Sequence, residues 1–453
     1  MASDLAWPAL RDCLHTYATL TGAAVDTWHD GLELRVPRAS LRVQKQESSL
    51  TVSGRRAAWL PPTPRVPLPV PEKAEEVWRT AAALTGLMEA GLPLPGPALE
   101  TLLAALEHES WLIATLACDL LNRTGVPGVP EFVRAHGLTP AVPGSGSTGG
   151  NGTFTEVWEA RISVDEYALF EATHPGYAVQ MVELGHMILA HAPFLPDAVL
   201  DVGSGPGLPT VMLAEIFPDA HIDAVEPSPA AFPHLLRNTS GHAVTAHRTG
   251  ITDFSGRRDY PVTVSVGASH HMDTRMFLRG LKEHTAPGGL VIVADEMIAP
   301  FSSDAERAQA VIDHHFAYID EALAHVPVAE LPPVEQRRLL ALLDKDRRTP
   351  ALLPALLEET RRDREFPTTA HGGPWQRVRF CVLELEALVA GVDYDVERKT
   401  WVENFLTLAR DEGLEPVAHR RVHATVGGRD LDAGTHVVAL RNPIPAPETS
   451  RTL

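Results

Sequence analysis

A glycine-rich turn lies between a short apolar strand and an apolar helix, and it constrains the fold more than any other segment. The sequence reads LDVGSGPG, with glycines at 203, 205 and 207, and continues as PTVMLAEIF. Because glycine lacks a Cβ atom, the backbone can turn sharply there and approach a ligand closely. The pattern predicts an α/β fold with a parallel sheet and a ligand-binding loop at Asp201–Gly207.

An acidic residue follows the next predicted strand. The strand His221–Val225 ends at Glu226, and one helix and one strand separate this residue from Gly207. That separation places the carboxylate beside the loop, where it can accept hydrogen bonds from both hydroxyls of a ribose. The glycine spacing is GxGxG, and Leu208 occupies the position of the third glycine in GxGxxG, which argues against a nicotinamide enzyme.

Strands and helices alternate after the loop. This alternation is what a parallel sheet with crossover helices requires. The last two strands are separated by GGRDLDAG, which predicts a hairpin at the sheet edge. The predicted strands are Ala198–Val202, His221–Val225, Val244–His247, Val262–Val266 and Leu290–Ala294, followed by Glu415–Val426 and Thr435–Arg441.

Together these segments resemble the class I S-adenosylmethionine-dependent methyltransferases. Asp201–Gly207 is similar to their first motif and Glu226 to their ribose-binding acid, while Thr249–Asp253 lies where their adenine loop follows the third strand. The resemblance covers about residues 165–441, less a long insertion, and is nearest in character to bacterial enzymes of specialised metabolism. The other stretches that match in order are Val264–His271, Ala286–Val293 and Glu412–Val417.

The resemblance implies a Rossmann-like sheet of seven strands, mostly parallel, with an antiparallel last strand. It also implies S-adenosyl-L-methionine as cofactor and in-line methyl transfer to a small-molecule or peptide acceptor. Many relatives carry Asp directly after the glycine of the adenine loop, where this sequence has Ile251, so we expect backbone amides and Ile251 to hold the adenine. The residues implied at the cofactor are Asp201, Gly203, Ser204, Gly205, Gly207, Glu226, Pro227, Gly250, Ile251, Thr252, Gly267, Ala268, Tyr167 and Tyr177.

Candidate catalytic side chains follow two predicted strands, at the edge where α/β folds bind their ligands. His270 and His271 follow the fourth strand, and Asp295 and Glu296 follow the fifth. We predict His271, His270 and Glu296 as catalytic residues, because a hydroxyl acceptor needs a base, although a carboxylate or carbanion acceptor does not. The alternative roles are structural: the histidines could support the cofactor loop, and the acidic pair could be a solvated loop end.

Two predicted helices could close the pocket. The segment before the first strand carries Tyr167, His174 and Tyr177, which suit a lid but could instead pack that helix on the sheet. His314 and His315 lie on a later helix. Adjacent helix positions point about 100° apart, so at most one of the two histidines would face a substrate.

Composition and periodicity divide the chain into regions. Alternating apolar residues between Leu32 and Val52 predict a small antiparallel sheet near the N-terminus. The run PGSGSTGGNGT is typical of a flexible linker. The predicted regions are an N-terminal α+β region at 1–143 with a role in substrate binding or dimerisation, a linker at 144–153, a class I methyltransferase domain at 154–443 with a helical insertion at 302–412, and a tail at 444–453.

Charge and residue usage argue against several classes of protein and site. The chain has 39 basic and 58 acidic residues and a formal net charge of −19, which is unfavourable for a generic nucleic-acid or anionic-membrane surface. Its three cysteines are far apart, so a disulfide framework is not expected. Since no HxxxH or HExxH pair with acidic partners occurs on one helix, we predict no metal.

These observations favour a cytoplasmic enzyme, because the chain has neither a signal-like N-terminus nor an apolar run of about 20 residues. We expect a small-molecule or peptide substrate and no nucleic-acid or membrane partner, and we leave a homodimer open. The competing class is an S-adenosylmethionine-binding protein that does not transfer methyl, such as a cyclase, a decarboxylase or a regulatory module.

Overall fold

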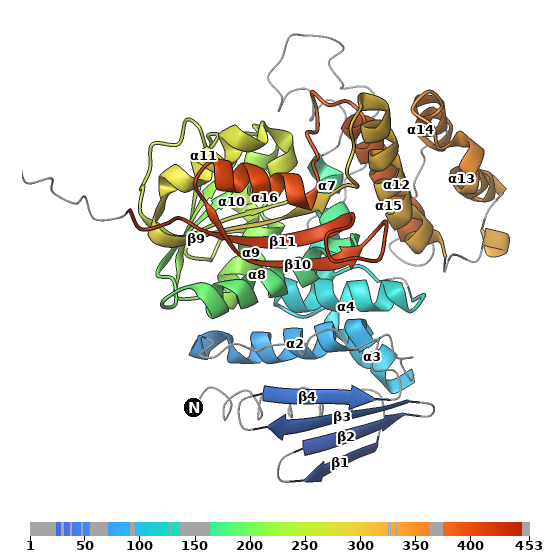
Figure 1. The fold of residues 1–453 in the computed structure, drawn as a ribbon. Helices are drawn as coiled ribbons and strands as arrows, with labels where there is room; N and C mark the ends of the chain where they lie inside the picture. Colours follow the sequence, from blue (N-terminus) through green and yellow to red (C-terminus); the bar gives the residue numbers. More distant parts are fainter. Residues whose placement is uncertain are drawn as a thin grey trace, which may run out of the picture.

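The computed structural model describes residues 71–90, 96–126, 128–135, 164–324, 328–331, 333–361 and 375–445, residue 326, and four strands between 24 and 54. Within these residues a central sheet is flanked by helices on both faces, with further helices below it and at one end (Figure 1). None of the described helices is both long and apolar enough to span a bilayer.

The central sheet has seven strands in the order β10-β11-β9-β8-β5-β6-β7. Strand β11 runs antiparallel to both of its neighbours, and the other pairings are parallel. The predicted mostly parallel sheet with an antiparallel last strand is therefore confirmed. The strands are β5 (Ala198–Val202), β6 (His221–Val225), β7 (Val244–His247), β8 (Tyr260–Val266), β9 (Thr285–Met297), β10 (Glu415–Ala424) and β11 (Gly434–Arg441).

Both faces of this sheet are covered, which explains its long apolar strands. Successive residues of a strand point to opposite faces, and in β9 Leu290 and Ile292 pack in one core whereas Val291 and Val293 pack in the other. The helices that contribute to the first core include α8 (Tyr177–His191) and α9 (Leu208–Ile216), and those of the second are α11 (Thr274–His284) and α16 (Val402–Asp411). Helix α10 (Ala231–Asn238) links β6 to β7.

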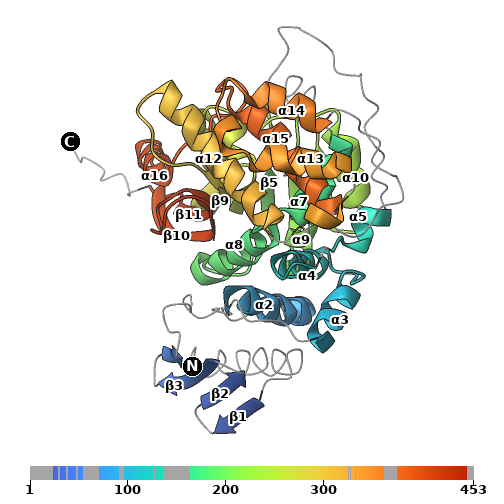
Figure 2. The same ribbon diagram turned by 90° about the vertical axis from the view of Figure 1, so that its right-hand side faces the viewer.

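The predicted insertion is helical, and it begins directly after β9. Its helices are grouped at one end of the sheet, and in Figure 2, viewed from that end, they lie in front of the strands. Helix α16 differs because it packs against α11 and the sheet, so it is a crossover helix of the core and the inserted helices end with α15. The inserted elements are α12 (Asp304–Leu323), η4 (Val328–Glu330), α13 (Pro333–Leu343), η5 (Lys345–Arg347), α14 (Leu353–Arg361) and α15 (Trp375–Gly391).

The N-terminal region contains the predicted small sheet and a layer of helices. The alternating residues form four antiparallel strands in sequential order, which confirms the sheet. The predicted linker at 144–153 and residues 446–453 of the tail lie outside the described residues. The elements are β1 (Ala24–Trp28), β2 (Gly31–Val36), β3 (Ala39–Gln46), β4 (Ser49–Gly54), η2 (Glu72–Ala74), α2 (Glu75–Ala90), α3 (Gly96–Ala105), α4 (Trp111–Arg123) and α5 (Glu131–Ala135).

Helices α2 and α4 lie against α8 and α9 (Figure 1) and share their hydrophobic core. The side chain of Trp78 on α2 is 1% exposed, its Nε1–H donates to the carbonyl of Ile216 at 3.1 Å, and its ring stacks on His186. Glu215 of α9 accepts hydrogen bonds from the amides of Trp111 and Leu112, which caps the N-terminus of α4. The composition of the chain changes after residue 143, but helices from both sides of this boundary contribute to one hydrophobic core.

We expect the free energy of unfolding of the Trp78→Ala variant to be about 3–5 kcal/mol lower than that of the parent protein, because the change removes a fully buried indole and leaves a cavity. Urea unfolding followed by circular dichroism measures this. Arg79→Ala is the matched control on the same helix, where only an exposed pair with Glu75 is lost and less than about 1 kcal/mol is expected. Equal stability of the two variants would contradict a shared core.

Candidate functional site

The glycine loop leaves β5 at the point where the strand order reverses. The chain continues from β5 to β6 and β7 on one side and then crosses to β8 and β9 on the other. Open α/β sheets bind their ligands at such a switch point. The amides of Gly203 and Ser204 both donate to the carbonyl of Val225, at 2.9 and 3.2 Å, and this ties the loop to the end of β6.

Two glycines of the loop have different surroundings although both have positive φ. Gly203 has φ +74°, and a Cβ atom built on it would lie 2.4 Å from the Cβ of Ala268. Gly205 has φ +52°, and a Cβ atom there would meet nothing within 4 Å. The backbone at Gly203 therefore has to pack closely on the loop after β8, whereas Gly205 borders open space.

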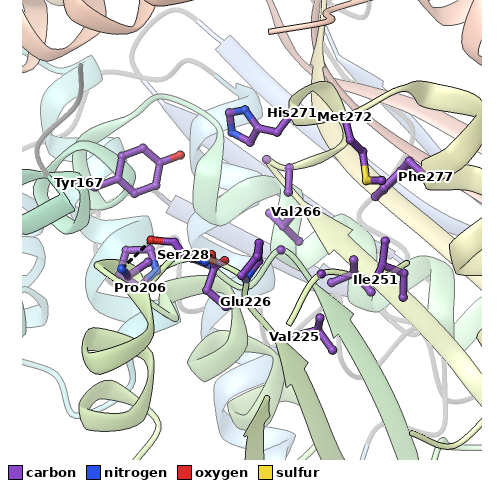
Figure 3. Close-up of a pocket in the computed structure, with 18 of the residues that line it drawn as sticks. Tyr167, Pro206, Val225, Glu226, Ser228, Ile251, Val266, His271, Met272 and Phe277 are labelled. Atoms are coloured by element: carbon purple, nitrogen blue, oxygen red, sulfur yellow. Dashed lines mark hydrogen bonds between the residues drawn. The ribbon is translucent and has the colours of Figure 1, made fainter. Parts of the chain in front are cut away.

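The open space is a cavity of about 360 Å³, which is within the size range of small-molecule sites. In Figure 3, Tyr167 and His271 lie across this cavity from Glu226 and Val225. The predicted cofactor residues that line it are Gly203, Gly205, Glu226, Pro227, Gly250, Ile251, Thr252, Gly267, Ala268, Tyr167 and Tyr177.

Glu226 lies at the end of β6 with its carboxylate turned back to the loop. One oxygen accepts from the amide of Gly205 and the other from the amide of Ser228, both at 2.7 Å. A carboxylate can accept about four hydrogen bonds. Glu226 therefore holds the loop, and it also lines the cavity beside the open backbone of Gly205.

Three predicted cofactor residues lie outside the lining and shape the loop instead. Asp201 is buried and accepts a hydrogen bond from the hydroxyl of Thr210 at 2.6 Å. Burial raises the pKa of Asp201 to about 6, although the hydroxyls of Thr210 and Ser204 oppose this. Gly207 has φ +99° and precedes the first residue of α9.

A second, smaller cavity of about 40 Å³ adjoins the first, and we call it the inner cavity. Four residues, Tyr167, Tyr177, Gly267 and His271, line both cavities. The inner cavity is rich in ionisable groups, which is unusual for a buried space and needs pairing of the charges. Its other lining residues are Phe170, His174, Gln180, His270, Asp295, Glu296, His315, Ala387, Glu397, Lys399 and Thr435.

His270 is fixed by a buried carboxylate. Its Nδ1 lies 2.8 Å from an oxygen of Asp295, whose other oxygen accepts from the amide of Ser269. Burial opposes ionisation of Asp295, but the charge and hydrogen bond of His270 outweigh it and lower the carboxyl pKa. The ionised carboxylate therefore accepts the Nδ1–H of His270 and sets the orientation of the ring.

Glu296 is surrounded by basic side chains. Its oxygens lie 3.1 Å from Nε2 of His174, 3.3 Å from Nζ of Lys399 and 3.5 Å from Nε2 of His314. Burial would raise the pKa of Glu296, but Lys399 and the two histidines hold it well below the usual range. The structure thus excludes the solvated loop end that the sequence had left as an alternative.

A segment after the inserted helices completes the inner cavity. The amide of Arg398 donates to the carbonyl of His270 at 2.6 Å, which brings Glu397 and Lys399 beside the histidine pair. Nζ of Lys399 lies 2.5 Å from Oε2 of Glu397, and both side chains are almost fully buried. Burial opposes the charge of Glu397, but Lys399 lowers its pKa to about 2.

Comparison with known proteins gives the family of the segment that lines much of the larger cavity. Residues 199–289 match a family model described as a methyltransferase domain, a segment that contains the glycine loop, Glu226 and the loop after β8. The chain carries a class I S-adenosylmethionine-dependent methyltransferase domain. The match spans about a fifth of the chain, and among curated proteins no sequence match is found.

Solved structures similar to this methyltransferase include two other methyltransferases. The geranyl diphosphate C-methyltransferase of Streptomyces coelicolor is 11% identical, with 62% of this chain and 86% of that chain covered and a TM-score of 0.31. The 1,6-didemethyltoxoflavin-N1-methyltransferase of Burkholderia thailandensis is 13% identical, with 58% and 78% covered and a TM-score of 0.30. Scores this low carry no argument about the acceptor.

Burial keeps His271, His314 and His315 of the methyltransferase neutral at pH 7. Burial lowers the pKa of His271 to about 3, with a further contribution from His270. His314 and His315 are fully buried, and burial lowers their pKa values to about 4 and about 3. Of these two, His315 lines the inner cavity and His314 does not.

The sequence patterns did not predict several residues of the site. Glu171 on α7 (Val164–Thr173) lines the larger cavity and lies four residues after Tyr167, so helical spacing alone could have found it. Burial raises its pKa to about 8, although the hydroxyl of Tyr177 donates to it. Glu397 and Lys399 carried no signal, because no motif surrounds them. The other residues that line the larger cavity and were not predicted are Val202, Pro206, Val225, Ser228, Ala231, Val266, Met272 and Phe277.

Proposed function

We propose that this methyltransferase transfers the methyl group to a polar group of a small molecule or peptide that enters the inner cavity. The observation that carries the proposal is the position of His271 in the wall between the two cavities. A donor in the larger cavity and an acceptor in the inner one would meet there. The inner cavity is small, so it would receive the reactive group rather than the whole acceptor.

The larger cavity suits S-adenosylmethionine, which supplies an electrophilic methyl group on a sulfonium cation. Glu226 would accept the ribose hydroxyls, and the open backbone at Gly205 leaves room for the ligand. Ile251, in the loop that resembles the adenine-binding loop, would contact the adenine. The carboxyl of Glu171 faces the same cavity and would stabilise the positive charge of the donor once it ionises.

The catalytic role of the chain is then mainly alignment in a site from which water is excluded. His271 is neutral at pH 7 and can accept a proton from an O–H or N–H acceptor. His270, held by Asp295, and Glu296, held by Lys399, would position the acceptor and the ring of His271. We therefore propose His271 as the base and the other two predicted catalytic residues as positioning residues.

A crystal structure with bound S-adenosylmethionine tests this function. We expect the ribose on Glu226 and the methyl group directed at the opening beside His271 and Tyr177. A methyl group enclosed by protein on all sides would contradict the transferase proposal and favour a binding role. Mass spectrometry of small molecules that co-purify with the protein would then identify the acceptor class.

A further inference from the structure

We propose that His270, His271 and Glu397 bind one divalent first-row transition-metal ion at the wall between the two cavities. One ligand atom from each of the three side chains lies within 4.8 Å of the others. Ligand atoms bound to one ion at about 2.1 Å lie at most about 4.2 Å apart. Small rotations of these side chains would therefore close the set around an ion.

The chemistry of the three ligands selects the class of ion. Two imidazoles and one carboxylate suit zinc, iron, nickel or copper, whereas magnesium and calcium prefer oxygen ligands alone. Catalytic sites with two histidines and one carboxylate keep further coordination positions open. Here His270, Glu397 and His271 all line the inner cavity, so positions that the protein leaves open would face it.

Asp295 provides an independent observation that points to a metal. Histidines that bind metals usually donate their second ring N–H to a carboxylate, which fixes the tautomer and turns the other nitrogen to the ion. Asp295 accepts this hydrogen bond from Nδ1 of His270 at 2.8 Å. The lone pair of His270 is then on Nε2, the nitrogen left for an ion.

Backbone hydrogen bonds hold Glu397 next to the histidines in the absence of an ion. The carbonyl of Glu397 accepts from the guanidinium of Arg307, which also donates to the carbonyl of Gly391 at 3.1 Å. The next residue along the chain, Arg398, donates to the carbonyl of His270. The segment that carries Glu397 is thus hydrogen-bonded directly to the segment that carries His270 and His271. The backbone therefore does not have to rearrange to bind an ion.

The charges of the residues that line the inner cavity favour the binding of a cation. Among its described lining residues, Asp295, Glu296 and Glu397 are acidic, and Lys399 carries the one fixed positive charge. Lys399 is shared between Glu296 and Glu397, so a divalent ion beside Glu397 would add positive charge to a lining that has more carboxylates than lysines or arginines. Lys399 donates to Oε2 of Glu397, so we assign the other oxygen, Oε1, to the ion.

The proposal departs from our expectation of no metal, which considered ligands on a single helix. An imidazole that binds an ion cannot accept a proton, so with the ion bound the acceptor would be activated by the ion and not by His271 as a base. That role rests on the proposed function, but the binding itself does not. Metal content can therefore be tested without knowledge of the acceptor.

The test uses untagged protein that has been stripped with a chelator and titrated with Zn²⁺ or Co²⁺. We expect about one equivalent per chain by mass spectrometry of the metal, and absorption bands of Co²⁺ in a site of low symmetry. His271→Ala and Glu397→Gln should each weaken binding by more than the 10- to 100-fold expected for Asp295→Asn. His419→Ala is the matched control, because it removes one of another close histidine pair, His419 and His436, on β10 and β11.

Binding that is equal in the parent and all ligand variants would identify an adventitious ion and overturn the proposal, as would stripped parent protein that binds no ion. Thermal unfolding of each variant distinguishes loss of a ligand from loss of the fold, and Asp295→Asn keeps the test valid if Glu397→Gln does not fold. Titration of the stripped parent protein with S-adenosylhomocysteine separately reports on the cofactor site, so failure of the metal site and failure of the proposed function have different signatures.

Discussion

Replacement of Glu226 with Ala is expected to weaken the binding of S-adenosylhomocysteine by roughly 30- to 1,000-fold. Hydrogen bonds to a charged partner each contribute about 1.5–3 kcal/mol, and loss of those to the ribose is expected to total about 2–4 kcal/mol after partial replacement by water. The carboxylate also accepts from the amides of Gly205 and Ser228, so some of the loss would come from the loop. Isothermal titration calorimetry measures the effect directly.

The matched control for this prediction is Glu226→Gln. The amide retains one oxygen acceptor for the loop, but it carries no charge and its NH₂ group replaces the other oxygen, so it can accept about half of the hydrogen bonds that the carboxylate can accept. Its affinity should lie between those of the parent and Glu226→Ala. Both variants should keep the far-ultraviolet spectrum of the parent, and an affinity of Glu226→Ala within threefold of the parent would contradict the ribose role.

The sheet and the larger cavity were predictable because their signals are local. The loop at 203–207, the acid at 226 and the strand ends at 250–252 and 267–268 each lie within a few residues of an apolar strand. The fixed geometry of the α/β fold then brings these strand ends to one edge. Sequence spacing along one β–α unit was enough to predict which side chains would meet.

The inner cavity was only partly predictable because its walls come from distant parts of the chain. Glu397 lies 126 residues after His271, and among the described residues the inserted helices α12 to α15 lie between them. No period or spacing connects such positions, and the contact depends on a hydrogen bond between Arg398 and the carbonyl of His270. Spacing along a single helix therefore could not indicate the ligand set that we propose.

The N-terminal boundary shows a different limit of composition. The linker composition at 144–153 suggested separate units, but α4 packs against α7 and α8, the helices that carry Tyr167 and Tyr177. Asp119 of α4 accepts a hydrogen bond from the amide of Gly176, directly before Tyr177. Composition reports how a segment behaves by itself, whereas shared burial depends on which surfaces match in three dimensions.

Gly203→Ala is expected to reduce mainly the stability of the fold, and Gly205→Ala mainly the affinity for the cofactor, although both residues lie in the same loop. At Gly203 the new methyl group would clash with Ala268, so we expect a loss of stability of about 3 kcal/mol or more, the sum of left-handed backbone strain and overpacking. At Gly205 the methyl group meets no atom of the chain, and only the backbone strain of about 1–2 kcal/mol is expected.

Binding should follow the reverse order, since the methyl group of Gly205→Ala would enter the space that we assign to the cofactor. We expect Gly205→Ala to fold and to lose at least roughly tenfold in affinity for S-adenosylhomocysteine, which corresponds to about 1.4 kcal/mol. Urea unfolding and calorimetric titration of both variants give the two quantities. If Gly205→Ala bound the ligand as tightly as the parent, the backbone at this position would not face the cofactor, and the ligand would have to lie elsewhere in the cavity.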